Sequence, residues 1–328
     1  MKAAFYDRLG AARDVLQLGE VEEPQPQPGE VRVRIWWSGI NPSDVKSRAG
    51  LRGRSMDFPR IIPHSDGMGV IDHVGPGVES ARVGERVWLM NAAWGRPSGT
   101  AAEWCCVPTS MAVPLPDNVD DWFGACLGIP AMTALHAVLL DGGVAGRTVL
   151  VAGGAGSVGH YAVQFASQLG AAHVITTVGS DANAAIARAA GADTVVNRRT
   201  EPVVDTVMTV TGGRGADRVI EVDFANNIGM DVDLLRPGGE CVAYGSTPRP
   251  AELPFPKLLA KNVQLKFFMV YHLPGNDRQQ AVDVLTRLLQ RGALAHRVGV
   301  RLPLSEIVSA HELVERGGTP GKVLLRIG

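Results

Sequence analysis

Cysteine is scarce in this chain of 328 residues, and none of its four cysteines forms a C-x-x-C pair. Cys105 and Cys106 are adjacent, an arrangement that chelates metal poorly and strains a disulfide, while Cys126 and Cys241 stand alone. This usage argues against a cysteine-based metal site. It favours buried thiols in a reducing compartment, and we expect a cytoplasmic protein.

An excess of charge and long apolar runs are also missing. The chain has 32 Lys and Arg residues against 33 Asp and Glu, a net charge of −1, so it has no basic field for a nucleic-acid backbone. No apolar run approaches the roughly 20 residues of a membrane-spanning helix. The first ten residues, MKAAFYDRLG, do not read as a secretory signal. We therefore expect no nucleic-acid partner and no membrane partner.

The length predicts two domains, and the pattern changes along the chain. Residues 1–119 contain short alternating runs such as VRVRIWW, which predict a compact, mainly β domain. Residues 120–269 repeat an apolar strand followed by an alanine-rich helix, which predicts a doubly wound parallel sheet. Residues 270–328 hold a helical pattern at 277–294 and end in a strand, GKVLLRIG, that we expect to complete the first domain. The expected fold class is α/β.

A glycine-rich turn follows the first strand of the second domain, in VLVAGGAGSVGHYAVQF (149–165). It contains a G-x-G-x-x-G that follows a strand and opens a helix, the context that makes this motif a dinucleotide-binding signature. Gly154 would permit the tight turn, Gly156 would let a pyrophosphate approach the backbone, and Gly159 would let helix and strand pack closely. The helix N-terminus would attract the phosphates. The predicted phosphate-binding residues are Gly154, Ala155, Gly156, Ser157, Val158 and Gly159.

The coenzyme type is read at the end of the next strand, HVITTVGS, where an NAD-binding protein usually has an acidic residue. Residues 178–180 are Val, Gly and Ser, which leave room for a 2′-phosphate, so we expect NADP(H) rather than NAD(H). Asp181 could instead reach a ribose hydroxyl, which keeps NAD(H) as the alternative. The candidate 2′-phosphate donors are Ser180, Asn183 and Arg198, with Arg188 and Arg199 nearby.

Several further motifs accompany the glycine turn: GINPSDVKSRAG (39–50), IIPHSDGMGVIDHVGPGV (61–78), RPGGECVAYGS (236–246) and GKVLL (321–325). With them the chain resembles, over essentially its whole length, the medium-chain dehydrogenase/reductase superfamily in its zinc-free quinone oxidoreductase branch. The resemblance implies a GroES-like N-terminal domain completed by the C-terminal tail, a Rossmann domain between them, and an active site in the cleft. It also implies a homodimer. The apolar segment LKFFMVY (265–271) fits either an edge strand that pairs with a second copy or a strand buried in the interior.

Zinc-dependent members of this superfamily hold their catalytic metal with a Cys, a His and a further Cys or Asp. Here Asn41 stands at the Cys position, Ser65 at the His position, and Ile129 near the third. A zinc site needs three or four N, S or O ligands, so we expect no metal. His64 is shifted by one residue and reads as a pocket or core histidine.

Without a Lewis acid, a quinone is an easier hydride acceptor than a simple ketone, because its conjugated system spreads the added electrons. We therefore expect an NADPH-dependent quinone reductase. The alternatives are an NADPH-dependent reductase of enal or enone double bonds, and a non-catalytic nucleotide-binding or structural protein.

The resemblance also implies site residues beyond the phosphate loop. It makes Asn41 a donor to the acceptor or a contact to the nicotinamide ribose, and places Thr133 near the nicotinamide. Asp44 would order its loop or transfer protons. Lys46 and Arg52 stand where the family often has aromatic residues beside the acceptor. The remaining cofactor-binding candidates are Gly245, Ser246, Phe268 and Val270 on the nicotinamide side and Lys322 at the pyrophosphate.

Overall fold

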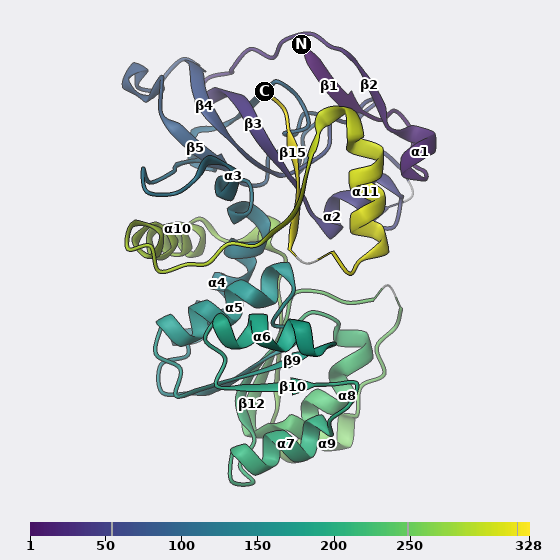
Figure 1. The fold of residues 1–328 in the computed structure, drawn as a ribbon, viewed down its shortest axis with the longest axis vertical. Coiled ribbons are helices and arrows are strands. Elements are labelled where there is room, and N and C mark those ends of the chain that lie inside the picture. Colours follow the sequence, from purple (N-terminus) through teal and green to yellow (C-terminus); the bar gives the residue numbers. More distant parts are fainter. Residues whose placement is uncertain (54, 248, 320) are drawn as a thin grey trace. The chain divides into compact units, whose positions relative to one another are not determined.

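The computed structural model describes residues 1–53, 55–247, 249–319 and 321–328. It divides into two compact units, coloured along the chain in Figure 1. The first, called here the β unit, comprises Met1–Ile129 and Val282–Gly328, and the second, the α/β unit, comprises Pro130–Ala281. The junctions follow residues 129 and 281, where the sequence pattern places them after 119 and 269. Each unit is described by itself.

The β unit is built on a seven-stranded sheet with strand order β14-β15-β3-β4-β5-β7, in which β6 also pairs with β3. The long strand β3 (Glu30–Ile40) alternates along its first half, and Val31, Val33 and Ile35 are buried on one face. The other strands are β4 (Asp66–Val74), β5 (Arg86–Leu89), β6 (Trp104–Pro108), β7 (Ala112–Pro114), β14 (Val298–Pro303) and β15 (Lys322–Arg326). A separate hairpin joins β1 (Lys2–Phe5) to β2 (Gln17–Glu20).

The C-terminal tail contributes two strands to this sheet, because β15 pairs antiparallel with β3. In that register Val323 lies opposite Ile40, so Lys322 stands beside Asn41, just past the end of β3. Asn41 caps α2 (Pro42–Arg48), where the Asp44 carboxylate accepts the backbone N–H of Asn41 at 2.7 Å. The other helices here are α1 (Ala12–Val15), α3 (Asp121–Gly124) and α11 (Ile307–Arg316), and α10 (Gly275–Gln290) crosses the junction.

The α/β unit holds a six-stranded, all-parallel sheet with the order β10-β9-β8-β11-β12-β13. This is the doubly wound order in which ligands bind at the carboxyl ends of the strands, where the order reverses between β8 and β11. The strands are β8 (Thr148–Val151), β9 (His173–Val178), β10 (Thr194–Asn197), β11 (Ala216–Glu221), β12 (Leu235–Ala243) and β13 (Gln264–Phe267). The predicted α/β class, with a GroES-like and a Rossmann part, is confirmed.

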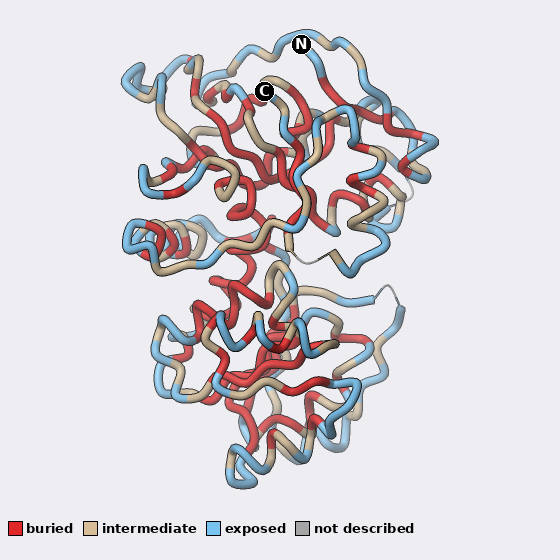
Figure 2. Tube along the Cα trace, viewed as in Figure 1, coloured by how far each residue is buried: buried red, intermediate tan, exposed pale blue. Residues whose placement is uncertain are grey.

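Helices lie on both faces of this sheet (Figure 1). They are α4 (Met132–Leu139), α5 (Ser157–Gln168), α6 (Asp181–Ala189), α7 (Val203–Val210), α8 (Phe224–Leu234) and α9 (Phe255–Lys261). The burial trace runs red through the strands and pale blue along the outer turns of helices (Figure 2). A core that includes Leu150, Val219, Ile228 and Cys241 packs between β8, β11, β12 and α8. Helices α7 and α9 are not among the elements that the sequence pattern predicts.

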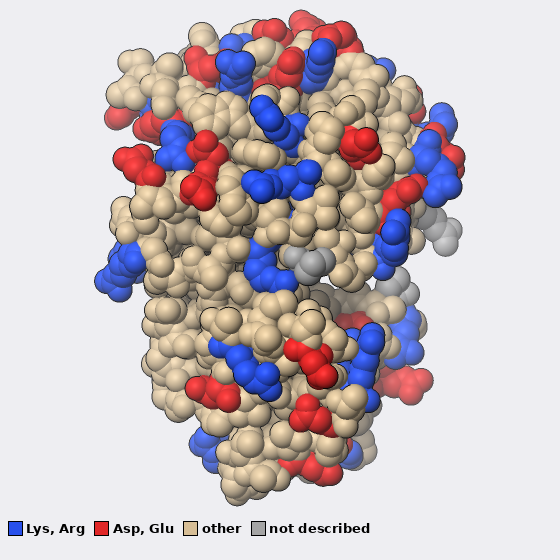
Figure 3. Space-filling model, in the orientation of Figure 1, with Lys and Arg blue, Asp and Glu red and all other residues tan. Residues whose placement is uncertain are grey.

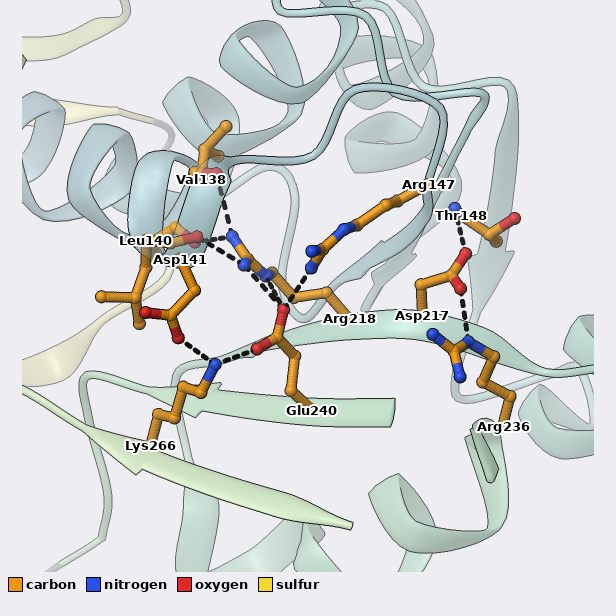
Figure 4. A network of polar contacts seen from close by, with 11 residues as sticks. Val138, Leu140, Asp141, Arg147, Thr148, Asp217, Arg218, Arg236, Glu240 and Lys266 are labelled. Carbon is orange, nitrogen blue, oxygen red and sulfur yellow. Dashed lines mark hydrogen bonds and ion pairs between the residues drawn. The ribbon is translucent and has the colours of Figure 1, made fainter. Parts of the chain in front are cut away.

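A buried polar network fastens α4 to the sheet (Figure 4). The Arg218 guanidinium, fully buried on β11, donates to the carbonyl oxygens of Val138 (2.9 Å) and Leu140 (2.7 Å) at the end of α4. It also donates to Glu240 on β12, whose other carboxylate oxygen accepts from Lys266 on β13. The guanidinium thus caps the helix carbonyls, and its charge is paired within the network.

The surface is electrically mixed. On the face shown in Figure 3, acidic and basic side chains are interspersed, in keeping with the net charge of −1. Within the described residues, every helix is too short or too polar to cross a bilayer.

Candidate functional site

The glycine turn joins β8 to α5, as the motif predicts, but two of its glycines have structural roles that differ from the predicted ones. Gly153 takes the positive φ of the turn, +71°, a role that the sequence pattern gives to Gly154. Gly154 is required by packing, because a Cβ there would lie 2.1 Å from Thr176 Oγ1. At Gly159 a Cβ would lie 2.2 Å from the Gly153 carbonyl oxygen, so this glycine allows the close helix approach that was expected.

Gly156 differs from its neighbours, because the protein itself leaves room for a side chain there. It is exposed, its φ is ordinary, and the nearest atom to a Cβ would be the Gly153 carbonyl oxygen at 3.2 Å. Gly156 caps the 12-residue helix α5, so the exposed backbone at this point borders the first N–H groups of that helix. Packing does not require a glycine at this position. The absence of a side chain here instead allows a ligand to approach the backbone.

Two threonines of β9, which the sequence reading passed over, hold the turn in place. Thr177 Oγ1 accepts the backbone N–H of Gly153 at 3.2 Å, and its carbonyl oxygen accepts that of Gly154 at 3.1 Å. Thr176 Oγ1 donates to the Val151 carbonyl oxygen at 2.7 Å. The signal was present as two consecutive hydroxyl residues in the apolar strand HVITTV. Such hydroxyls need buried partners, which strand β8 and the glycine turn supply here.

The end of β9 carries the residues expected at a 2′-phosphate. Ser180 caps α6 and its Oγ accepts the backbone N–H of Asn183 at 3.3 Å. The guanidinium groups of Arg198 and Arg199 lie beside Gly179, at 3.9 and 3.8 Å from where its Cβ would be. Both arginines are exposed. The structure thus brings Arg198 and Arg199 together with the end of β9.

Two further residues bear on the choice between NADP(H) and NAD(H). Asp181 Oδ1 accepts the side-chain N–H of Asn197 at 2.9 Å, so the acid that could reach a ribose hydroxyl is engaged by β10. Arg188 is in the last turn of α6, whereas Ser180 caps the first. Arg188 therefore lies about 12 Å further along the helix axis than Ser180, at 1.5 Å per residue. The cationic group at the end of β9 is therefore formed by Arg198 and Arg199.

The second half of the sheet places its candidates at the carboxyl ends of β12 and β13. A Cβ on Gly245 would lie 2.4 Å from the Val222 carbonyl oxygen, so the turn after β12 packs closely on the turn after β11. Ser246 Oγ accepts the backbone N–H of Ala225 at 3.1 Å. Phe268 contacts His136 of α4 edge to face, with ring centres 4.6 Å apart. Val270 is buried, as is Thr133 in the first turn of α4.

In the β unit, Asn41 belongs to a buried polar cluster with Asp66 and Lys322. Its Nδ2 donates to Asp66 Oδ2 at 2.8 Å, and its Oδ1 accepts from Lys322 Nζ at 2.5 Å. Lys322 Nζ also donates to Asp66 Oδ2 at 2.7 Å, and the backbone N–H of Ile129 donates to Asp66 Oδ1 at 2.7 Å. The exposed fractions of Asn41, Asp66 and Lys322 are 3%, 0% and 3%. Lys322, predicted at the pyrophosphate, thus makes its recorded contacts inside the β unit.

Asp44 adds a titratable group beside this cluster. Burial, and then the charge of Asp66, raise the pKa of the Asp44 carboxyl to about 7, while its hydrogen bond from the Asn41 backbone lowers it. The loop-ordering role is visible, since that bond closes the cap of α2. A proton-transfer role for Asp44 stays a prediction.

His64 lies in a directed chain of hydrogen bonds. Thr100 donates its hydroxyl proton to the Asp66 carbonyl oxygen at 2.6 Å, so it accepts from Ser38 at 2.7 Å. Ser38 therefore accepts from His64 Nδ1 at 2.8 Å, which leaves His64 Nε2 to accept from His311 Nε2 at 2.8 Å. Burial lowers the pKa of both imidazoles, in keeping with two neutral rings. His64 is a core residue with both nitrogens engaged.

Comparison with known proteins agrees with this architecture. Residues 27–117 match the alcohol dehydrogenase GroES-like domain, and residues 157–287 match the zinc-binding dehydrogenase domain. A quinone oxidoreductase from Rattus norvegicus is 30% identical over 315 residues, which cover 95% of this chain and 94% of that protein. The chain belongs to the medium-chain dehydrogenase/reductase superfamily. It is an oxidoreductase similar to the quinone oxidoreductases.

Other relatives differ in activity and coenzyme. A 2-haloacrylate reductase from a Burkholderia species is 30% identical over 99% of this chain and 98% of its own. Among solved structures that each cover all of this chain and are themselves fully covered, a mycobacterial protein complexed with NADPH has a TM-score of 0.87 at 28% identity. An NAD-dependent alcohol dehydrogenase has a TM-score of 0.89, also at 28% identity.

The zinc named in the second family description does not fit the residues of this chain. Asn41, Ser65 and Ile129 stand at the expected ligand positions, and none is a usual zinc ligand. The oxygens of Asp66 already accept from Asn41, Lys322 and the Ile129 backbone, and a buried ammonium beside them would repel a dication. Burial raises the pKa of the nearby Cys126 thiol to about 12, so that thiol stays protonated. In the described part of the chain, no group of three or more His, Cys, Asp or Glu side chains could hold a metal.

Proposed function

We propose that this oxidoreductase reduces quinones by hydride transfer from NADPH, without a metal. Three features support the proposal: the glycine turn at the switch point of a parallel sheet, the arginines at the end of β9, and a polar cluster that does not suit zinc. The similarity to quinone oxidoreductases over nearly the full chain points the same way.

The α/β unit would hold the coenzyme through its strand ends. The turn at 154–159 would bind the pyrophosphate on backbone N–H groups. Ser180, Asn183, Arg198 and Arg199 would bind the 2′-phosphate, because charge-assisted hydrogen bonds favour a dianion. The nicotinamide side would be formed by Thr133, Gly245, Ser246, Phe268 and Val270. Bound NADPH supplies the hydride.

On the acceptor side, Asn41 would donate a hydrogen bond to the oxygen on which negative charge develops. A fixed donor in a site closed to water is worth far more than the same donor in solution. A quinone makes a modest demand on such a site, because its ring delocalises the added charge. Quinone reduction is therefore the reaction that this metal-free residue set suits best.

The exposed backbone at Gly156, where a Cβ would make one tight contact but no severe overlap, carries the proposal and gives its sharpest test. In Gly156→Ala the Cβ meets one protein atom, at 3.2 Å, and Ala caps a helix less well than Gly, so we expect a small fall in Tm. Its methyl group would lie on the pyrophosphate path, so the Kd for NADPH should rise at least about 10-fold, the equivalent of roughly 1.4 kcal/mol.

Gly159→Ala is the matched control, because its Cβ would meet a backbone oxygen at 2.2 Å. That overlap should cost about 1–3 kcal/mol of stability, seen as a lower Tm. Titration of tryptophan fluorescence with NADPH, alongside thermal melts, separates the two effects. Unchanged NADPH affinity in Gly156→Ala would refute binding at this turn.

The second candidate function is reduction of an activated carbon–carbon double bond, which the similarity to a 2-haloacrylate reductase favours. NADPH oxidation with 1,4-benzoquinone, 9,10-phenanthrenequinone and an enal distinguishes the two. We expect kcat/KM to be highest with a quinone. A higher value with the enal would select the alternative, and tight NADPH binding without any turnover would indicate a non-catalytic protein.

We further propose that the protein is a homodimer and acts in the cytoplasm. Strand β13 is an edge of its sheet, and large apolar side chains are exposed on and around it: Leu253, Phe255, Leu259, Phe267 and Met269. Such an edge favours pairing with a second copy. The four cysteines are all free thiols, which suits a reducing compartment.

A further inference from the structure

The side-chain amide of Asn41 is held between two opposite charges, which fixes its orientation. The Lys322 ammonium can only donate, so it selects the amide oxygen. The Asp66 carboxylate accepts, so it selects the amide nitrogen. A flipped amide would set an N–H against the ammonium and an oxygen against the carboxylate. The usual twofold ambiguity of an asparagine side chain is therefore removed by its surroundings.

One hydrogen of this amide remains for a ligand. Asn41 Nδ2 carries two, and Asp66 takes one at 2.8 Å. Among the described residues the structure records no acceptor for the second. Asn41 can therefore offer a single N–H in one fixed direction, while its oxygen is unavailable to any ligand.

The ammonium also changes the strength of that donor. A cation bound to an amide oxygen draws electron density from the nitrogen, which strengthens its N–H groups as donors, and burial keeps this effect from being screened by water. The side chains of the cluster are at most 3% exposed, and Asp66 neutralises Lys322, so the charge pair can persist away from water.

We propose that Lys322 and Asp66 are positioning residues that act through Asn41, so that a buried ammonium, in place of a metal ion, polarises the group that binds the acceptor oxygen. This inference rests on the proposed function, in which Asn41 is the donor. It assigns Lys322 to the acceptor side of the reaction. Its charge reaches the substrate through one amide and needs no contact with the coenzyme.

The test removes both charges together, because a single substitution would leave the other charge buried and unpaired. In Asp66→Asn/Lys322→Met the cluster stays neutral, and Asn41 loses the ammonium. The matched control is Arg32→Met/Asp72→Asn, which removes another ion pair of the same sheet, between β3 and β4, with Arg32 Nε 2.9 Å from Asp72 Oδ1. A third variant, Asn41→Ala, removes the donor itself.

The first readout needs neither coenzyme nor activity. With the side-chain nitrogen of asparagine labelled with ¹⁵N, Asn41 in the unliganded wild type should show one amide proton, held by Asp66, that is shifted downfield and is slow to exchange with water. Both features should be lost in Asp66→Asn/Lys322→Met and kept in the control variant. An Asn41 signal that is the same in all three proteins would overturn the positioning role.

The second readout compares the effect of each substitution on kcat with its effect on the Kd for NADPH. We expect Asp66→Asn/Lys322→Met to lower kcat at least about 10-fold, since loss of an oxyanion donor costs about 10²–10³ and here only its orientation and polarisation are lost. Its Kd for NADPH should stay within about twofold of the wild-type value, a change below 0.5 kcal/mol. The control should keep wild-type kcat.

Two results would overturn the inference while leaving the proposed function intact. A raised NADPH Kd with unchanged kcat would place Lys322 on the coenzyme. Wild-type turnover in Asn41→Ala would remove the donor role from Asn41. If the wild type itself reduces no acceptor, the proposed function fails, and the amide signal still decides the positioning role.

Discussion

Asp231 and Glu221 form a buried pair of acids in the α/β unit, and the pair makes stability depend on pH. Each is 1% exposed, Asp231 on α8 and Glu221 at the end of β11. Glu221 Oε1 accepts from the Asp223 backbone N–H and from Asn227 Nδ2, whereas Glu221 Oε2 is buried and accepts no hydrogen bond from the described protein groups. A protonated Asp231 can donate to that oxygen.

Burial, and then the charge of Glu221, raise the pKa of the Asp231 carboxyl to about 9. An unfolded Asp has a pKa of about 3.9, so between these values the folded state binds the extra proton. Stability therefore falls as pH rises from about 4 to about 9, by up to about 1.4 kcal/mol per pH unit. Over the two pH units from pH 5 to pH 7, the free energy of unfolding therefore falls by about 2.7 kcal/mol at most. This value is an upper limit because Glu221 shares the same proton, which lowers the contribution of Asp231 alone.

In Asp231→Asn the amide can donate to Glu221 at every pH, so this part of the pH dependence should vanish. We expect its Tm to exceed the wild-type Tm by up to about 5–10 °C more at pH 7 than at pH 5, at 2–4 °C per kcal/mol. Scanning calorimetry across this range measures the difference. Asp233→Asn, a partly exposed residue of the same helix that pairs with Lys257, is the control and should track the wild type. Parallel curves for wild type and Asp231→Asn would refute the shared proton.

Two other predictions concern the coenzyme and the assembly. Replacing Arg198 and Arg199 by Ala should weaken NADPH binding by about 10–100-fold, from the loss of charge-assisted hydrogen bonds worth about 1.5–3 kcal/mol. NADH affinity should hardly change, and Arg188→Ala should leave both affinities as they are; an equal loss for NADPH and NADH would contradict a 2′-phosphate site. Phe267→Glu, on an edge strand and 62% exposed, should convert the dimer to a monomer in light scattering. A wild type that already elutes as a monomer would contradict the dimer.

The features that sequence predicted are those with a local signal. The strand and helix around the glycine turn follow from periodicity, and the close approach at Gly159 follows from the motif. The separate roles of Gly153, which has the positive φ, and Gly154, which packs against Thr176, could not be predicted from the motif. They depend on Thr176, which belongs to the next strand. Helices α7 and α9 were missed because they are only eight and seven residues long and a proline stands at the N-cap of each.

Contacts between residues that are far apart along the chain could not be predicted from the sequence. Asn41 and Lys322 are 281 residues apart, and only the pairing of β15 with β3 makes them neighbours. The family resemblance marked both residues as site candidates, but it assigned Asn41 to the acceptor side and Lys322 to the pyrophosphate. His64 and His311, 247 residues apart, meet in the same way. Spacing along a chain carries no information on such pairs, since they depend on strand order and register.

The most direct test of the central claim is NADPH oxidation with 1,4-benzoquinone by protein dialysed against a metal chelator. We expect turnover equal to that of undialysed protein, and at least about 10-fold lower kcat/KM with NADH than with NADPH. Loss of turnover on dialysis that added zinc restores, or equal use of the two coenzymes, would contradict the account.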